Sequence, residues 1–131
     1  MGSTSLEVLL DQVRARGAFA SRQQAAGAVE NVLAILGAHL VGDDRTDLAR
    51  LLPEQCGQVL AGAEPASEPL TPGEFVDAVA ARTGDDTAGA RRAVTAVLGT
   101  LARAADDALL RRILTQLPPG HAGLFGRTEP I

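Results

Sequence analysis

The stretch "LTQLPPGHAGLF", Leu114 to Phe125, repeats the pattern of "ARLLPEQCGQVL", Ala49 to Leu60, at an offset of 65 residues. Each stretch contains Leu-Pro and closes on two apolar residues. The same offset pairs apolar residues earlier in the chain: Ala25 with Ala90, Val29 with Val94, Val32 with Val97 and Leu36 with Leu101. After a one-residue slip, the pairing continues through Leu10 with Val76, Asp11 with Asp77 and Arg16 with Arg82. This self-similarity predicts a duplicated helical unit whose two copies bury each other's apolar faces.

The composition predicts that the unit is built from α-helices alone. Apolar residues make up 46% of the 131 residues, but Trp and Tyr are absent and Phe occurs only three times. Ala and Leu dominate, and these are strong helix formers, whereas the β-branched and aromatic runs typical of strands are missing. We therefore expect an all-α fold, and the length favours one domain.

Helix start signals recur at matching places in the two halves. The motif "TPGE" at 71–74 has the spacing of a capping box with proline in the first turn, and "TSLE" at 4–7 has the same box spacing. These motifs predict a first helix over about 5–16 and its copy over about 72–82.

Polar residues mark the expected starts of the later helices. Ser21 and Asp86 are the predicted N-caps of the second helix in each half. Asp43-Asp44 and Asp106-Asp107 are expected to begin the third helices, where capping and the helix macrodipole favour aspartate. No His or Glu follows the aspartate pairs, Asp85-Asp86 included, at ligand spacing, so we expect no metal and no cofactor.

Proline sets the expected corners and completes the predicted architecture. Pro53 and Pro118 should each end a third helix, because proline cannot donate the next backbone hydrogen bond, and then begin a short fourth helix. The expected fold is two pseudo-symmetric tandem units, each of three helices plus a short fourth, packed as one compact helical domain. The expected boundaries are a first unit at 1–61, a Pro-, Ala-, Ser- and Glu-rich connector at 62–70, a second unit at 71–126 and a frayed tail at 127–131.

Charge and cysteine content bear on the compartment and the partners. The net charge is −4, so the whole molecule lacks the basic field of a general nucleic-acid binder. The single cysteine excludes an intramolecular disulfide and fits a reducing cytosol. The longest apolar run, at 32–42, contains a histidine and is far shorter than a membrane span. We expect a soluble, cytoplasmic protein that does not insert into membranes.

The second half carries a family resemblance. The segments "EFVDAVAARTG", "ARRAVTAVLGTL" and "LLRRILTQLPPGHAGLF" resemble the bacterial family catalogued as domain of unknown function 2267. Through both copies the resemblance covers most of 5–126 and rests mainly on core and corner residues. One departure is His121, where the family tends toward an aromatic residue. The resemblance implies an all-helical, soluble bacterial protein and provides no catalytic residues.

One candidate site lies between the expected units. It would combine His39, Cys56 and His121, and Cys56 is the counterpart of His121 at the offset of 65. A nucleophilic cysteine needs a nearby base and an orienting group, and no third residue or oxyanion-hole loop accompanies these three. A small buried cysteine commonly acts as a core residue, so the packing interpretation is favoured over catalysis.

A second candidate is a surface rich in arginine. Residues 88–117 contain five arginines and only two aspartates, a balance that could suit phosphate or an acidic partner: Arg91, Arg92, Arg103, Arg111 and Arg112. A solvated face explains the same pattern, and the absence of interleaved aromatic residues disfavours stacking on single strands.

The sequence leaves three functions open. The favoured one is a non-enzymatic cytosolic adaptor or regulatory module that binds another protein or a second copy of itself. The first alternative is a DNA-associated regulator that uses the five arginines. The second alternative is a small-molecule binder or enzyme with its site between the repeats.

Overall fold

The computed structural model describes residues 5–66 and 68–126, which form helices and contain no strand. The all-α prediction is therefore confirmed. The described residues form eight helices: α1 (Leu6–Gly17), α2 (Arg22–Ala38), α3 (Gly42–Arg50), α4 (Glu54–Gly62), α5 (Pro72–Thr83), α6 (Thr87–Ala104), α7 (Asp107–Gln116) and α8 (His121–Leu124). The tail predicted to fray, 127–131, lies outside the described residues.

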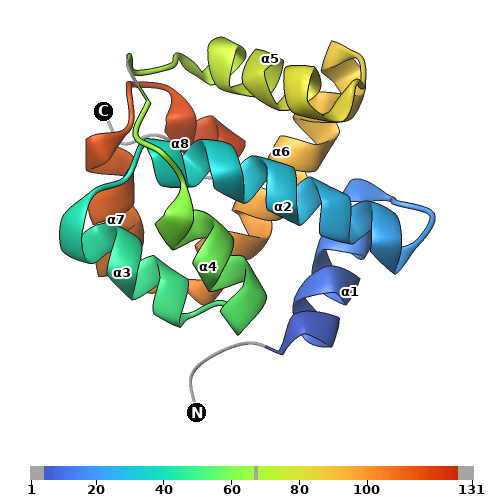
Figure 1. Ribbon diagram of the computed structural model, residues 1–131, viewed down its shortest axis with the longest axis horizontal. Helices are drawn as coiled ribbons and strands as arrows, with labels where there is room; N and C mark the ends of the chain where they lie inside the picture. Colours follow the sequence, from blue (N-terminus) through green and yellow to red (C-terminus); the bar gives the residue numbers. More distant parts are fainter. Residues whose placement is uncertain (1–4, 67, 127–131) are drawn as a thin grey trace.

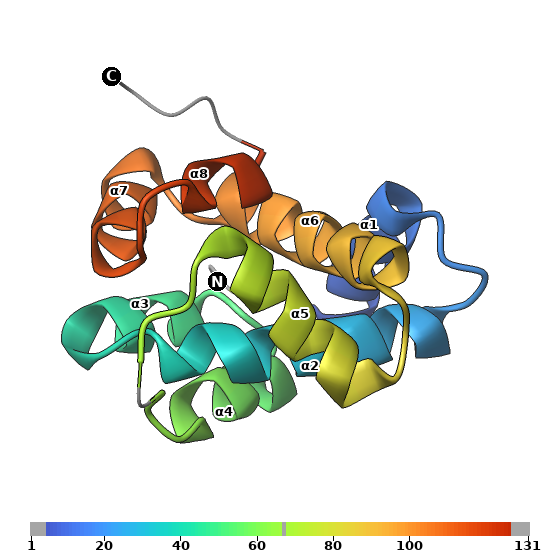
Figure 2. The same cartoon turned by 90° about the horizontal axis from the view of Figure 1, so that it is seen from above.

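The two longest helices, α2 and α6, pack against each other at the centre of the fold (Figure 1). Helix α1 packs on both of them, and α5 does the same from the opposite side (Figure 2). Helices α3 and α7 meet at one end, α4 covers α2 and α3, and α8 rests on α6. The first three helices of each half match closely in length, with 12, 17 and 9 residues against 12, 18 and 10.

Most helices begin where the sequence signals place them. Ser21, Asp86 and Asp106 each accept a hydrogen bond from the backbone three residues later, and Thr71 forms the full capping box with Glu74. Each bond satisfies a donor that the first helical turn leaves unpaired. These starts confirm the predicted N-caps.

Two predicted starts require correction. The box at 4–7 does not cap α1, because the N-cap is Ser5, which accepts from the Val8 amide; Thr4 lies outside the described residues. Helix α3 has Val41 as its N-cap and no side-chain capping bond. Asp43 and Asp44 lie inside its first turn, where they can favour the helix through the macrodipole but do not cap it.

The fourth helices differ between the halves. Helix α4 starts directly after Pro53, as predicted, but α8 starts only at His121, three residues after Pro118. A second proline, Pro119, disfavours helical backbone at Pro118, and Gly120 has a left-handed φ of 96°. The prediction that Pro118 begins a helix was therefore wrong, and α8 spans only four residues.

The segment between the halves is tied to the end of α2. The Ala66 amide donates to the Ala38 carbonyl at 2.9 Å, and the Leu70 amide donates to Nε2 of His39 at 3.3 Å. These bonds hold Ala66 and Leu70 against the end of α2. Helix α4 extends to Gly62, one residue into the stretch expected to connect the units.

Candidate functional site

The first half contains an apolar groove between α1, α2 and α4. Its volume is about 300 Å³, and its lining residues are Leu6, Leu10, Ala26, Val29, Glu30, Gln55, Cys56 and Val59. Leu6, Ala26 and Val59 are half-buried, so apolar surface remains accessible within the groove. Glu30 and Gln55 are exposed and give it a polar rim. We call this feature the α1/α2/α4 groove.

Cys56 belongs to the wall of this groove and is only 6% exposed. Burial raises the pKa of its thiol, which keeps the thiol protonated and makes it a poor nucleophile. Val29 lines the same groove, and His39, the C-cap of α2, follows ten residues later, about 15 Å away along the helix. Cys56 and His39 therefore occupy different parts of the fold.

The two histidines of the candidate site do come together, on either side of Phe75. The ring centroid of Phe75 lies 6.1 Å from that of His39 and 5.7 Å from that of His121, in an edge-on arrangement with the latter. Phe75 is completely buried near the start of α5. The cluster joins the end of α2, the start of α5 and the start of α8. Phe75 completes this cluster and was missed by sequence reasoning.

Hydrogen bonds define the state of both imidazoles. His39 Nε2 accepts from the Leu70 amide, so Nδ1 carries the proton and donates to the Ile35 carbonyl at 2.9 Å. His121 Nδ1 donates to the Pro118 carbonyl at 2.8 Å. Its Nε2 is buried without a partner among the described residues.

His121 is held in its neutral form. Burial lowers the pKa of its imidazole, whereas the bond to the Pro118 carbonyl opposes the shift. The ring is 1% exposed, so a proton added at Nε2 would have neither water nor an acceptor. This arrangement supports packing between the two halves rather than proton transfer to a substrate.

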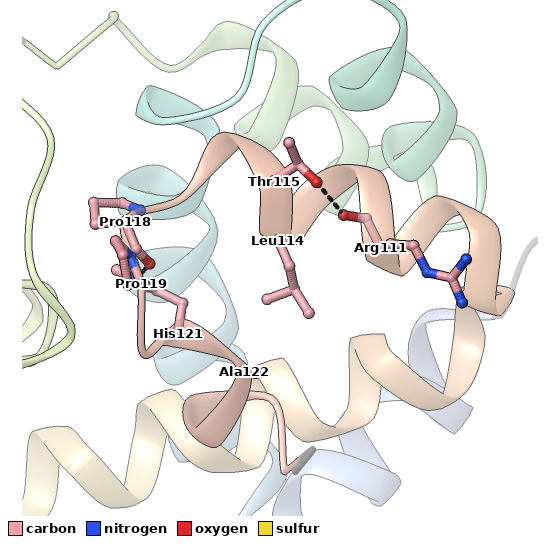
Figure 3. Close-up of a pocket in the computed structure, with 7 residues that line it drawn as sticks. All are labelled: Arg111, Leu114, Thr115, Pro118, Pro119, His121 and Ala122. Carbon is pink, nitrogen blue, oxygen red and sulfur yellow. Dashed lines mark hydrogen bonds between the residues drawn. The ribbon is translucent and has the colours of Figure 1, made fainter. Parts of the chain in front are cut away.

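A second cavity of about 230 Å³ lies between α7 and α8 (Figure 3). Leu114 points into it, and His121 and Ala122 form the side that belongs to α8. Arg111 lies on the α7 side, where its backbone carbonyl accepts a hydrogen bond from the Thr115 hydroxyl at 2.9 Å.

The helix pair of the first half that corresponds to α7 and α8 is α3 and α4. In the first half, α3 and α4 pack closely, because a Cβ at Gly57 would come within 2.8 Å of the Ala49 carbonyl oxygen. At the offset of 65 the counterpart of Gly57 is Ala122, and that of Ala49 is Leu114. Both counterparts carry larger side chains, and both line the cavity between α7 and α8.

The position of Cys56 in the α1/α2/α4 groove has a different residue and surroundings in the second half. There His121 takes the position of Cys56 and packs on Phe75. Gly120, the counterpart of Gln55, lies so near Pro72 that a Cβ on it would be 3.1 Å from the proline ring. A larger, buried imidazole therefore stands where the first half has Cys56, and the Gly120 backbone lies close to Pro72.

The five candidate arginines are distributed over two helices and have different surroundings. Arg112 forms ion pairs with Asp44, at 3.5 Å, and with Asp47, at 3.3 Å. The guanidinium of Arg92 lies 5.6 Å from the ring centroid of Phe19. The remaining three are exposed and have no acidic partner within the described part of the chain: Arg91, Arg103 and Arg111.

Comparison with known proteins identifies the family of the chain and assigns no activity to it. It matches the family described as "Uncharacterized conserved protein (DUF2267)" over residues 7–124. No curated protein matches it. Among residues 5–66 and 68–126, no group of three or more His, Cys, Asp or Glu side chains is arranged to hold a metal ion. Within the same residues, no helix has the length and apolar character needed to span a bilayer.

Proposed function

The chain belongs to the DUF2267 family, and we propose that it is a non-enzymatic helical module that binds another protein in the bacterial cytosol. The α1/α2/α4 groove is the proposed binding surface. The observation that carries the proposal is the accessible apolar surface of this groove beside Cys56, a position that His121 takes in the second half, where it packs on Phe75.

The chemistry of the groove indicates what the partner presents. Leu6, Ala26 and Val59 are only half-buried in the free chain, and covering them would remove apolar surface from water. A groove between three helices suits the apolar face of an amphipathic helix, whose anchors recur every three or four residues. Glu30 on the rim favours a partner helix with Lys or Arg beside its apolar anchors.

The DNA-associated alternative has less support. Arg112 pairs with Asp44 and Asp47, and Arg92 lies over Phe19, so two of the five arginines already have partners within the chain. The net charge of −4 also opposes general attraction to a polyanion.

The enzymatic alternative has less support as well. Cys56 lines the α1/α2/α4 groove, whereas His39 and His121 lie against Phe75. The buried thiol has a raised pKa, the opposite of what a nucleophilic cysteine requires.

Affinity capture with matched variants tests the proposed function. Val59→Asp places a charge in the groove, and Leu114→Asp places the same charge in the α7–α8 cavity of the other half. Both residues are half-buried, so circular dichroism and thermal melting should first show that both variants fold. We expect Val59→Asp to lose the partners captured by the unaltered chain and Leu114→Asp to keep them.

The captured partner should also protect Cys56. Reconstituted with the purified partner, the unaltered chain should react more slowly with a thiol reagent than it does alone. Equal capture by both variants, together with unchanged Cys56 labelling in the complex, would contradict binding in the groove.

A further inference from the structure

A cavity of about 290 Å³ lies between α1, α6 and the end of α8, away from the α1/α2/α4 groove. Two arginines from different helices line it, Arg16 on α1 and Arg103 on α6, and small residues form much of the remaining wall: Thr95, Gly99, Gly123 and Gly126. We call it the Arg16–Arg103 cavity. It is independent of the proposed protein-binding function.

Gly99 leaves room for the Arg16 side chain on α6, one turn before Arg103. A Cβ on Gly99 would lie 3.6 Å from Nη1 of Arg16, so the Arg16 side chain lies across the backbone of α6 at this point. Arg103 follows Gly99 by one helical turn on the same face of α6, where Cβ atoms are about 5–6 Å apart. Both arginines therefore border the same small volume.

The corresponding arginine of the second half has a side-chain acceptor, whereas Arg16 has none among residues 5–66 and 68–126. Arg82, which pairs with Arg16 in the repeat, lies across α2 and donates from Nε to Oδ1 of Asn31 at 3.1 Å. The counterpart of Asn31 at the offset of 65 is Ala96, which is buried and has no side-chain acceptor. No carboxylate in the described part of the chain lies within 4.0 Å of a guanidinium nitrogen of Arg16 or Arg103.

We propose that the Arg16–Arg103 cavity binds the phosphate group of a small soluble molecule, either inorganic phosphate or a phosphate ester. Two guanidinium groups, each of which can donate two parallel N–H hydrogen bonds, match a dianionic phosphate in charge and in geometry. A single guanidinium group is sufficient for a carboxylate. The Thr95 hydroxyl donates to the Arg91 carbonyl at 3.0 Å, so the donors to the ligand are the two guanidinium groups. The concave wall of three helices suits a small molecule better than a rigid duplex.

Calorimetric titration of the full chain with inorganic phosphate and with glycerol 3-phosphate, at constant ionic strength, tests this site. We expect saturable binding and a dissociation constant at least tenfold higher in Arg16→Gln and in Arg103→Gln. Arg16→Lys should give an intermediate dissociation constant, because lysine keeps the positive charge but cannot donate two parallel hydrogen bonds. Arg82→Gln is the matched control and should bind like the unaltered chain.

The two ligands distinguish the sources of the phosphate group. Tighter binding of glycerol 3-phosphate would identify an ester as the ligand, and equal or weaker binding would identify the free ion. Either result supports the site. A lack of saturable binding, an equal loss in Arg82→Gln, or binding of duplex DNA without binding of either small phosphate would overturn the proposal. Nitrogen-edited NMR of the arginine Nε–H groups shows directly whether Arg16 and Arg103 respond.

Discussion

Asp47 and Arg112 are 65 residues apart in the sequence and meet in space, with Oδ2 of Asp47 3.3 Å from Nη2 of Arg112. The same offset aligns the sequences of the two halves, so these residues occupy matching positions of the predicted repeat. In a symmetric pair of units, a residue contacts its own counterpart only close to the two-fold axis. Opposite charges at this position attract each other, whereas two identical charged residues would repel.

The Asp47–Arg112 contact leads to a geometric prediction. Superposing α1, α2 and α3 on α5, α6 and α7 should align the helices in order, with a rotation near 180° whose axis passes close to this ion pair. An experimental structure at atomic resolution provides the measurement. A different packing order in the two halves, or a rotation far from two-fold, would show that the sequence repeat does not correspond to a structural repeat.

Cys56 should behave as a core residue. In the native protein it should react slowly with thiol reagents, and it should react quickly in denaturant, because burial raises the pKa of its thiol. Replacing Cys56 with Ala should lower the free energy of unfolding by about 1 kcal/mol, the scale of a small core truncation. Timed labelling and denaturant titration measure the two quantities. Fast native-state labelling near neutral pH, with loss of function in a folded Cys56→Ala protein, would favour the enzymatic alternative.

His121 should make stability depend on pH. Its pKa is lowered in the folded state, so between about pH 6.5 and the folded-state pKa the unfolded chain binds more protons than the folded chain. The free energy of unfolding should therefore decrease as the pH falls below about 6.5 and level off below the folded-state pKa. Urea titrations across this range measure the effect.

The matched variant for this measurement is His121→Phe, which keeps a ring beside Phe75 and removes the titrating group. Its free energy of unfolding should decrease less between pH 7 and pH 5 than that of the unaltered chain. An identical slope in the two proteins would assign the pH dependence to other groups.

Duplex DNA should bind weakly or not at all at physiological salt. The acidic net charge and the internal pairing of Arg112 leave few free arginines to replace the counterions of the duplex. Mobility shifts and fluorescence anisotropy at 50 and 200 mM salt provide the measurement. Affinity that falls steeply with salt and disappears in the Arg91→Glu, Arg92→Glu double variant would instead favour the DNA-associated role.

Local signals were sufficient to predict most of the helices. A polar side chain three residues before a backbone donor is a property of the nearby sequence, and Ser21, Thr71 and Asp86 show it in the structure as predicted. The start of α8 depends on two adjacent constraints, Pro119 after Pro118 and the left-handed backbone of Gly120. The prediction from Pro118 alone therefore placed the start of α8 too early.

The surroundings of the candidate residues were harder to predict, because they depend on how closely helices approach. The repeat alignment pairs Cys56 with His121, but it does not show that one position borders an open groove and the other packs on Phe75. One contact did leave a signal in the sequence. Asp47 and Arg112 have opposite charges at matching positions of the repeat, and this could have identified their pairing.

The α3–α4 contact and the α7–α8 cavity differ in the size of the side chains between the helices. Gly57 and Ala49 let α3 and α4 come into close contact, whereas their larger counterparts, Ala122 and Leu114, line a cavity between α7 and α8. After a gene duplication, changes of side-chain size at such positions can give the two copies different surfaces. The paired architecture can thus acquire distinct surfaces in its two halves without any change in the helices that hold them together.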